Sequence, residues 1–357
     1  MEWTRTAAKF SVTPRFSHAS CAVGKTIYII GGQRKGYLAD VWAWDCAGDE
    51  WMGYTPAGKA PAARVQSAAV FSGKELLLFG GYVENVAEEN DLHALDVLHA
   101  EREFTWTQPQ VTGALPPKRY GHTATMVGAR MVVIAGQDSA AQLSDVWLLD
   151  TATYAWAEVH ASGDVFIPRA LHTATHVRDV GVVVLGGFNR KLRNLSQAHV
   201  LELSEGADAA AWRLCTDADP ARAFRGRAQH RAVAQAAHVI VFGGYDGERP
   251  LNDIVVFDCA SRTFRAAEQR AAPPEPRCRH TLELVGSDIY CMLGYKAETA
   301  VGPDVFSLQV GSDREGIDRI LGAGGGADGG VDGGAGERGG AGEPGGDDDE
   351  GDEAAER

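Results

Sequence analysis

Residues 227–258 read RAQHRAVAQAAHVIVFGGYDGERPLNDIVVFD, and the order of residue types in this stretch decides the fold. An Arg-x-x-His element opens the stretch, and the apolar run that follows ends in Gly243-Gly244. A turn containing Gly, Asp and Pro comes next, and Asp253 then opens a second apolar run. Short apolar runs separated by turn residues are typical of β-strands, so the stretch predicts consecutive antiparallel strands.

The same order of residues occurs six times along the chain. The second glycines of successive pairs lie 49, 55, 51, 57 and 50 residues apart. The glycine pairs, two of them degenerate, are Gly31-Gly32, Gly80-Gly81, Ala135-Gly136, Gly186-Gly187, Gly243-Gly244 and Leu293-Gly294. The Arg-x-x-His elements are Arg15/His18, Arg119/His122, Arg169/His172, Arg227/His230 and Arg277/His280, with Arg64 and Ser67 in the second unit. The aspartates are Asp40, Asp91, Asp145, Asp253 and Asp304, with Gln197 in the fourth unit. The aromatic residues that follow are Trp51, Trp106, Trp156, Trp212 and Phe264.

Each unit therefore contains four short strands within one period of about 50 residues. No stretch between the units has a convincing apolar period of 3.6 residues, so we expect little helix. A four-stranded sheet repeated radially is a propeller blade, and packing blades face to face buries apolar surface that a single blade leaves exposed. The sequence predicts an all-β, six-bladed β-propeller over residues 1–310.

The glycine pair, the spaced aromatic residues and the tryptophan of the fourth strand resemble the kelch repeat. The resemblance covers residues 3 to about 310 and recurs six times with nearly constant offsets. It implies a stand-alone, kelch-type propeller.

The N-terminus is expected to close the ring. The sixth unit has no tryptophan after Gln309, whereas Trp3 precedes the first Arg-x-x-His element as the fourth-strand tryptophan does elsewhere. We therefore predict that residues 2–9 form the outermost strand of the sixth blade, which removes exposed strand edge.

The negative charge is concentrated at the C-terminus. The chain carries a formal charge of −14, and residues 311–357 contain 14 acidic and 4 basic residues. This Gly/Asp/Glu-rich segment predicts a disordered acidic tail. The nearly neutral remainder argues against general binding to nucleic acid or to anionic membranes. Contact between the acidic tail, including Asp347–Glu350, and a basic face of the same chain is a further hypothesis.

Cysteine usage and hydropathy bear on the cellular compartment. The six cysteines form no C-x-x-C pair, so we expect free thiols in a reducing environment. The N-terminus has no apolar signal region, and no apolar run approaches the roughly 18 residues of a membrane-spanning helix. We expect a cytoplasmic protein without membrane insertion, with a nuclear location as the alternative.

The recurrent histidines and arginines have structural interpretations. Five histidines spread around a ring are too far apart for one metal site, whose bonds measure about 2.0–2.6 Å, so we expect buried histidines and neither a metal nor another cofactor. The arginines begin the first strand of each blade, on the face where the loop ending at the recurrent aspartate also lies. Arginine and aspartate could therefore pair blade by blade. Because Gln197 replaces the acid, Arg169 is the arginine that we expect to be free for a ligand.

The other interpretation makes this face a binding surface, since loops on a rigid scaffold carry function and Arg and Tyr anchor many interfaces. The predicted partner-binding residues are Arg34, Lys35, Tyr37, Arg119, Tyr120, Arg169, Phe188, Arg190, Arg193, Arg227, Tyr245, Arg249, Arg277 and Tyr295. In kelch adaptor domains of ubiquitin ligases, which the chain resembles, arginines at such places grip acidic peptides. The resemblance implies this role for Arg119, Arg169, Arg227 and Arg277. The alternative is that these charges only solvate the loops.

We expect an interaction scaffold or adaptor that binds a partner protein, or an acidic peptide segment, on this face. The sequence contains no nucleophile motif, phosphate loop or paired catalytic carboxylates, so no catalytic residue is predicted. Two alternatives stay open: a kelch-propeller enzyme of unrecognised activity, and a substrate receptor of a ubiquitin ligase. Plant specifier proteins, which are kelch enzymes, use an iron-binding Glu-x-x-x-Asp-x-x-x-His segment, and this spacing is not found.

Overall fold

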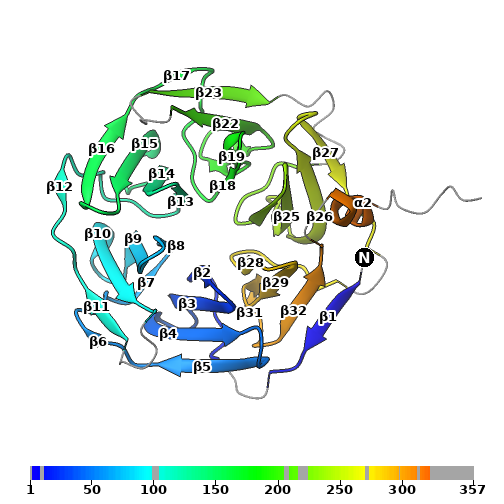
Figure 1. Cartoon of the computed structure of the whole chain (residues 1–357), viewed down its shortest axis with the longest axis horizontal. Coiled ribbons are helices and arrows are strands. Elements are labelled where there is room, and N and C mark those ends of the chain that lie inside the picture. The colour runs from blue at the N-terminus through cyan, green and yellow to red at the C-terminus, as the bar shows by residue number, and fades with distance from the viewer. Residues whose placement is uncertain are drawn as a thin grey trace, which may run out of the picture. The chain divides into compact units, whose positions relative to one another are not determined.

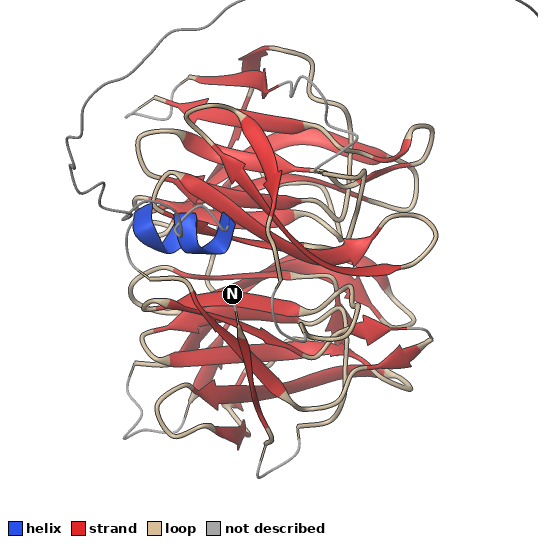
Figure 2. Cartoon of the chain, turned by 90° about the vertical axis from the view of Figure 1, so that its right-hand side faces the viewer, coloured by secondary structure: helices blue, strands red, loops and turns tan. Residues whose placement is uncertain are grey.

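Six sheets stand radially around one axis (Figure 1), and residues of their first strands line a channel. The computed structural model describes residues 2–8, 12–98, 104–204, 209–215, 224–269, 273–296, 298–311 and 314–321. Seen from the side, the strands cross the ring and the loops lie at its two faces (Figure 2). The predicted all-β, six-bladed propeller is thereby confirmed.

Each blade has four main strands, which run in order from the channel outward. Blade 1 contains β2 (Ala19–Val23), β3 (Thr26–Gln33), β4 (Tyr37–Asp45) and β5 (Glu50–Tyr54). Blade 2 contains β8 (Ala68–Phe71), β9 (Leu76–Val83), β10 (Ala87–Asp96) and β11 (Thr105–Thr107), and β7 (Arg64–Val65) also pairs with β9. Blade 3 contains β13 (Thr123–Val127), β14 (Arg130–Gln137), β15 (Gln142–Asp150) and β16 (Ala155–Val159).

The remaining blades repeat this order. Blade 4 contains β18 (Thr173–Val177), β19 (Gly181–Leu185), β22 (Ala198–Leu203) and β23 (Ala210–Cys215). Blade 5 contains β24 (Arg231–Gln235), β25 (His238–Tyr245), β26 (Pro250–Asp258) and β27 (Thr263–Ala266). Blade 6 contains β28 (Thr281–Val285), β29 (Asp288–Met292), β32 (Val305–Gln309) and β1 (Trp3–Thr6). Two short hairpins extend blades 4 and 6: β20 (Phe188–Asn189) with β21 (Arg193–Asn194), and β30 (Tyr295–Lys296) with β31 (Thr299–Ala300).

Apolar side chains between neighbouring sheets form the core. Between blades 1 and 2, for example, Tyr28 and Ile30 pack with Leu76, Leu78 and Trp106. All six cysteines are free thiols, as expected.

The glycine pairs are required by backbone geometry. Gly243 and Gly244 have φ angles of 63° and 101°, and a Cβ on Gly244 would lie 2.7 Å from the Cβ of His230. The second position therefore has no room for a side chain, whereas Ala135 and Leu293 occupy the first position at φ 52° and 58°. This explains why only the second glycine is present in all six units.

The N-terminal strand occupies the fourth place in blade 6. Strand β1 pairs antiparallel with β32, with Trp3 opposite Leu308 and Thr6 opposite Val305. Trp3 is buried, and its ring lies 5.4 Å from that of Phe242 in blade 5. The first and last strands of the ring thus share one sheet.

Three blades carry a fifth strand that the repeat pattern did not predict. The segments leading into blades 2, 3 and 4 form β6 (Ala57–Gly58), β12 (Thr112–Gly113) and β17 (Ala161–Gly163), which pair in parallel with the outermost strands β11, β16 and β23. Their common signal is a glycine six residues before the arginine of the next unit. At Gly113 a Cβ would overlap the carbonyl oxygen of Trp156, so the added strand depends on glycine there.

The predicted boundary at residue 310 is wrong, because a helix follows. Helix α2 (Arg314–Leu321) buries Ile317 and Ile320 against the core of blades 5 and 6, including Ile254 and Val256. The apolar residues of this helix are Ile317, Ile320 and Leu321, spaced i, i+3 and i+4. Three residues are too few to indicate a helix within a glycine-rich segment. The Val310 N–H donates to the carbonyl of Ser287 at 2.9 Å, in the turn between the first two strands of blade 6. Helix α2 therefore lies on the face away from the loops between second and third strands.

The rest of the predicted disordered tail, residues 322–357, lies outside the described residues, and so does its expected contact with the basic face. Within the described part of the chain, no helix is long and apolar enough to cross a membrane.

Candidate functional site

Each blade begins with a buried arginine. The six side chains are between 0% and 2% exposed and belong to Arg15, Arg64, Arg119, Arg169, Arg227 and Arg277. Four of them bind both oxygens of the recurrent aspartate, in the pairs Arg15–Asp40, Arg64–Asp91, Arg119–Asp145 and Arg227–Asp253. In one pair, Arg119 donates to Asp145 at 2.8 and 2.7 Å and to the Ala135 carbonyl at 2.9 Å. Burial raises the pKa of Asp145, but the hydrogen bonds and charge of Arg119 outweigh it, so the net shift is downward.

Arg169 is not the free arginine that the sequence predicted. It donates to the Gly186 carbonyl at 3.0 Å and to Oε1 of Gln197 at 3.3 Å, and burial lowers its pKa to about 10. Its guanidinium carbon lies 4.4 Å from the centre of the Phe166 ring. The guanidinium groups of Arg119, Arg169 and Arg227 are enclosed within the blades, so the structure does not place them on the surface as the predicted grip on a partner requires. Arg277 is equally buried.

The repeat histidines join neighbouring blades. Nε2 of His18 lies 2.6 Å from the Thr281 hydroxyl, and Nε2 of His230 lies 3.1 Å from the Thr173 hydroxyl. Burial lowers the pKa of both histidines below the ordinary value. Among the described residues, no group of three or more His, Cys, Asp or Glu is placed to hold a metal ion.

A closed ring of backbone hydrogen bonds surrounds the mouth of the channel. Its members are the residues just before the repeat histidines or Ser67: Ser17, Gln66, Gly121, Leu171, Gln229 and Arg279. Each N–H donates to the carbonyl of the preceding member, at 2.7–3.2 Å, and Ser17 closes the ring by donating to Arg279. All six have φ angles between 54° and 64°. The residues at this position therefore surround the mouth of the channel. In the sequence they are the variable residue directly before each repeat histidine or Ser67.

We call the face that carries this ring the loop face. It also carries the loops between the second and third strands, because isolated bridges tie the two sets of segments together. The bridges are Phe16–Gln33, Tyr120–Gln137, Ala170–Phe188, Ala228–Tyr245 and Cys278–Tyr295.

A cavity of about 800 Å³ opens on the loop face at the channel mouth. Five predicted binding residues line it: Tyr120, Phe188, Arg190, Arg193 and Tyr245. Sequence reasoning missed its other lining residues, among them Gln66, Gln229 and Arg279. We call this space the loop-face cavity. It combines three aromatic rings with three arginines, and its acids are Asp246 and Glu248.

The other predicted residues lie around this cavity without lining it. Tyr37 packs edge-on against Tyr82 with 6.4 Å between ring centres, and Tyr82 packs against Tyr120 at 5.4 Å. Tyr295 packs at 4.8 Å from Phe16. The remaining members of the predicted set on these loops are exposed: Arg34, Lys35 and Arg249.

Comparison with known protein families identifies the family of this propeller. The family described as "FBX42, beta-propeller domain" matches residues 15–212, which is more than half of the chain, and the Kelch motif matches residues 226–268. The chain belongs to the kelch-repeat β-propeller family.

Relatives of this kelch propeller differ in length. It is 29% identical over 283 residues to the serine/threonine-protein phosphatase BSL2 of Arabidopsis thaliana, covering 76% of this chain and 27% of that protein. It is 27% identical over 323 residues to Kelch domain-containing protein 3 of Homo sapiens, covering 84% and 82% of the two chains. It is 26% identical over 326 residues to the leucine-zipper-like transcriptional regulator 1 homolog of Drosophila melanogaster, covering 87% and 33%. The kelch relatives indicate a protein-interaction domain.

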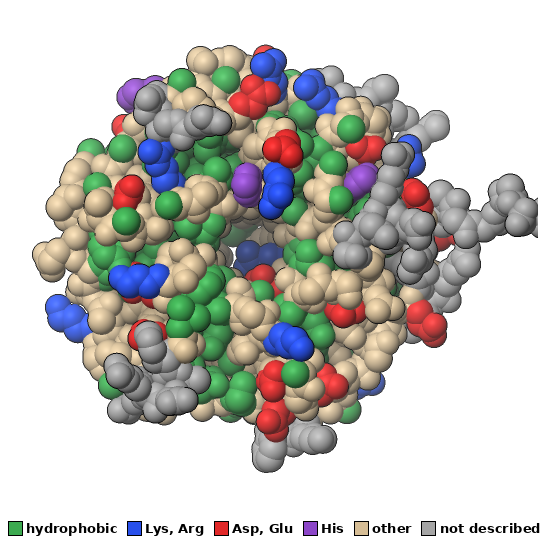
Figure 3. Space-filling view, in the orientation of Figure 1, with side chains coloured by type: hydrophobic (Ala, Val, Ile, Leu, Met, Phe, Trp, Pro, Cys, Tyr) green, Lys and Arg blue, Asp and Glu red, His purple; other side chains and the backbone are tan. Residues whose placement is uncertain are grey.

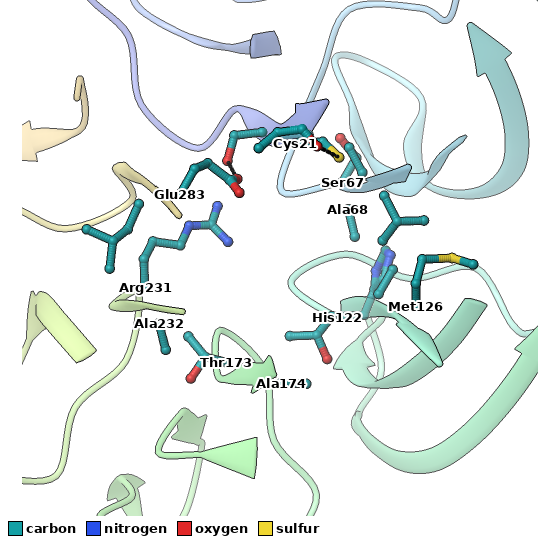
Figure 4. A pocket seen from close by; sticks show the side chains of 18 of the residues that line it. Cys21, Ser67, Ala68, His122, Met126, Thr173, Ala174, Arg231, Ala232 and Glu283 are labelled. Carbon is teal, nitrogen blue, oxygen red and sulfur yellow. Dashed lines mark hydrogen bonds between the residues drawn. The ribbon is translucent and has the colours of Figure 1, made fainter. Parts of the chain in front are cut away.

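The channel of the kelch propeller widens beneath the ring of backbone hydrogen bonds. This chamber has a volume of about 410 Å³ and opens on the face that carries α2 (Figure 3). Its wall is mostly alanine, serine and threonine, with Arg231 and Glu283 as its charged residues (Figure 4). Arg231 donates to the His280 carbonyl at 2.9 Å, and Ser20 donates to Glu283 at 2.7 Å. Burial raises the pKa of Glu283, while Ser20 and Arg231 oppose the rise.

Proposed function

We propose that this kelch propeller binds a partner protein and that the loop-face cavity receives an acidic segment of that partner. The observation that carries the proposal is the gathering of three aromatic rings and three arginines around one cavity of about 800 Å³. Arg190 and Arg193 are exposed, and Arg279 lies close to the rings of Phe16 and Tyr295, at 5.7 and 5.8 Å. Aromatic residues and arginine are the commonest anchors of protein interfaces.

Exposed apolar side chains also support the loop face as the binding surface. Four of the five large exposed apolar side chains of the described residues are Val86, Leu115, Val165 and Leu192. Val86 and Leu192 lie in loops between second and third strands. Leu115 and Val165 lie in the segments that lead from β12 and β17 to the arginines of blades 3 and 4. All four therefore stand on or beside the loop face, where a partner would cover them.

Charge reversal on one blade tests the proposal. Peptides selected from a displayed random library on the wild-type propeller should be rich in Asp and Glu. The double variant Arg190→Glu/Arg193→Glu should bind them at least about tenfold more weakly, with the largest loss at low salt.

The control is Arg178→Glu, an exposed arginine in the turn between the first two strands of the same blade, on the opposite face. This variant should bind the selected peptides as the wild type does. Equal binding by the double variant, or selection of peptides without acidic residues, would refute an acidic segment as the ligand of the loop-face cavity.

A further inference from the structure

The arginine that begins blade 6 has lost its carboxylate partner. Arg277 is 1% exposed and donates to the carbonyls of Glu275 and Leu293, both at 3.1 Å, as the equivalent arginines do in other blades. Asp304 occupies the position of the recurrent aspartate, but its carboxylate pairs with Arg5 of β1. Within the described ranges, no carboxylate lies within ion-pair distance of the Arg277 guanidinium.

The competing partner Arg5 distinguishes the acid of blade 6 from the acids of the other blades. In blades 1 and 3 the indole N–H groups of Trp42 and Trp147 donate to the aspartate at 2.8 and 2.7 Å and hold it towards the arginine. Phe306 occupies the equivalent place in blade 6 and has no donor, and its ring centre lies 5.2 Å from the Arg277 guanidinium carbon. Val255 of blade 5 has no donor either, yet Asp253 keeps its pair with Arg227, so the missing donor alone does not separate Asp304 from Arg277. The closing strand supplies Arg5, which binds the Asp304 carboxylate in place of Arg277.

The groups nearest to Arg277 do not neutralise it. The Glu275 carboxylate pairs with the ammonium group of Lys296. Burial raises the pKa of the Cys291 thiol to about 11, against the influence of Arg277, so this thiol is uncharged near pH 7. A buried cation without a counter-ion is costly to the fold, and an external anion would remove that cost.

A cavity of about 560 Å³ gives access to this cation. Arg277 lines it together with Trp3, Phe306, Pro273 and Val301. Two carboxylates also line it, Asp304 and Glu275, and each is paired with another cation, Arg5 and Lys296. We propose that this cavity binds a ligand through one carboxylate group, held by Arg277, with the apolar body of the ligand against Trp3 and Phe306. A planar guanidinium donates two parallel hydrogen bonds to a carboxylate, as the arginines of four other blades do to aspartate.

This site is separate from the loop-face cavity. The two cavities share no lining residue, so the site does not depend on the proposed function. The carboxylate can come from a free small molecule or from an acidic side chain of a bound chain. Benzoate represents the first source, and a blocked glutamate, N-acetyl-glutamate amide, represents the second.

Isothermal titration of the full chain with both probes tests the site. We expect saturable binding of benzoate and none of benzamide, which has the same shape without the charge. Arg5→Ala frees Asp304 to turn to Arg277, so it should weaken benzoate binding at least about tenfold. Phe306→Trp supplies the N–H that holds the aspartate in blades 1 and 3, and it should have the same effect without removing a charge.

Arg213→Ala is the matched control, because it removes an arginine from the exposed pair with Glu202 in blade 4. It should leave benzoate binding within about twofold of wild type, as should Arg190→Glu/Arg193→Glu. Binding of the blocked glutamate, with the same sensitivity to Arg5→Ala, would assign the site to acidic side chains as well. Benzamide binding equal to that of benzoate, undiminished binding in both Arg5→Ala and Phe306→Trp, or binding of neither acid would overturn the proposal.

Discussion

At the residue scale, the arginine that begins each blade has a role set by one neighbouring group. Where an aspartate accepts two hydrogen bonds, as in Arg119–Asp145, the pair is a structural tie inside the blade. In blade 4 an amide replaces the acid, and the Phe166 ring lies over the guanidinium of Arg169. In blade 6 the acid is present but engaged by Arg5. The same residue type at the same repeat position therefore has three different surroundings.

Removing one of the structural acids should destabilise the fold strongly. Asp145→Ala leaves the fully buried Arg119 without a counter-ion, and we expect the free energy of unfolding to fall by about 3–5 kcal/mol. Glu202→Ala, which breaks the exposed pair with Arg213, should lower the free energy of unfolding far less, because water and salt screen an exposed pair. Urea denaturation of both variants checks this, and equal losses would show that burial of the arginine is not what makes the pair important.

At the element scale, the ring depends on a strand from the far end of the sequence. Strand β1 completes blade 6, and Trp3 packs against Phe242 of blade 5, so the closing strand joins two blades. Helix α2 adds Ile317 and Ile320 to the same core. The last blade is thus held by both ends of the described chain.

Truncating the closing tryptophan should loosen this junction. Trp3 is 7% exposed, and Trp3→Ala removes a large buried ring, so we expect a loss of about 3 kcal/mol and a lower melting temperature. Thr4→Ala is the control on the same strand, because Thr4 is exposed. A thermal melt of Trp3→Ala that matches the wild type would mean that β1 contributes nothing to closure.

At the scale of the whole molecule, buried histidines are spread around the ring and respond to pH together. The five repeat histidines have lowered pKa values because of burial: His18, His122, His172, His230 and His280. For His122 and His230 the pKa falls to about 3. On acidification the unfolded chain takes up protons before the folded one does, so stability must fall with pH.

This coupling gives a defined pH dependence. Each histidine should lower the free energy of unfolding by up to about 1.4 kcal/mol per pH unit. This loss begins as the pH drops below about 6.5 and ends near the pKa of that histidine in the folded protein. The aspartates with lowered pKa values, such as Asp40 and Asp145, add their effect only below about pH 4. Urea denaturation at pH 7.5 and 5.5 should therefore show a clear loss at the lower pH. Equal stability at both values would contradict the burial of neutral histidines.

The sequence by itself determined the number of blades, their order and the place of each glycine pair. Each repeat has the same local backbone requirements. A position that has no room for a Cβ, such as Gly244, therefore appears in the sequence as a glycine that recurs in every unit. The sequence also predicted one shared face for five residues that line the loop-face cavity, because loop position follows from strand order. These residues are Tyr120, Phe188, Arg190, Arg193 and Tyr245.

Only the tertiary structure decided which arginines are accessible. Arg119 and Arg277 occupy the same position in the repeat, three residues before its histidine. The partner of each arginine, however, depends on side chains from distant segments, such as Arg5 and Phe306. The fifth strands also depended on pairing with the outermost strand of their own blade, and α2 on packing against blades 5 and 6, and no local period reports either. Side-chain pairing is set by distances across the fold, and these distances exist only after the ring has closed.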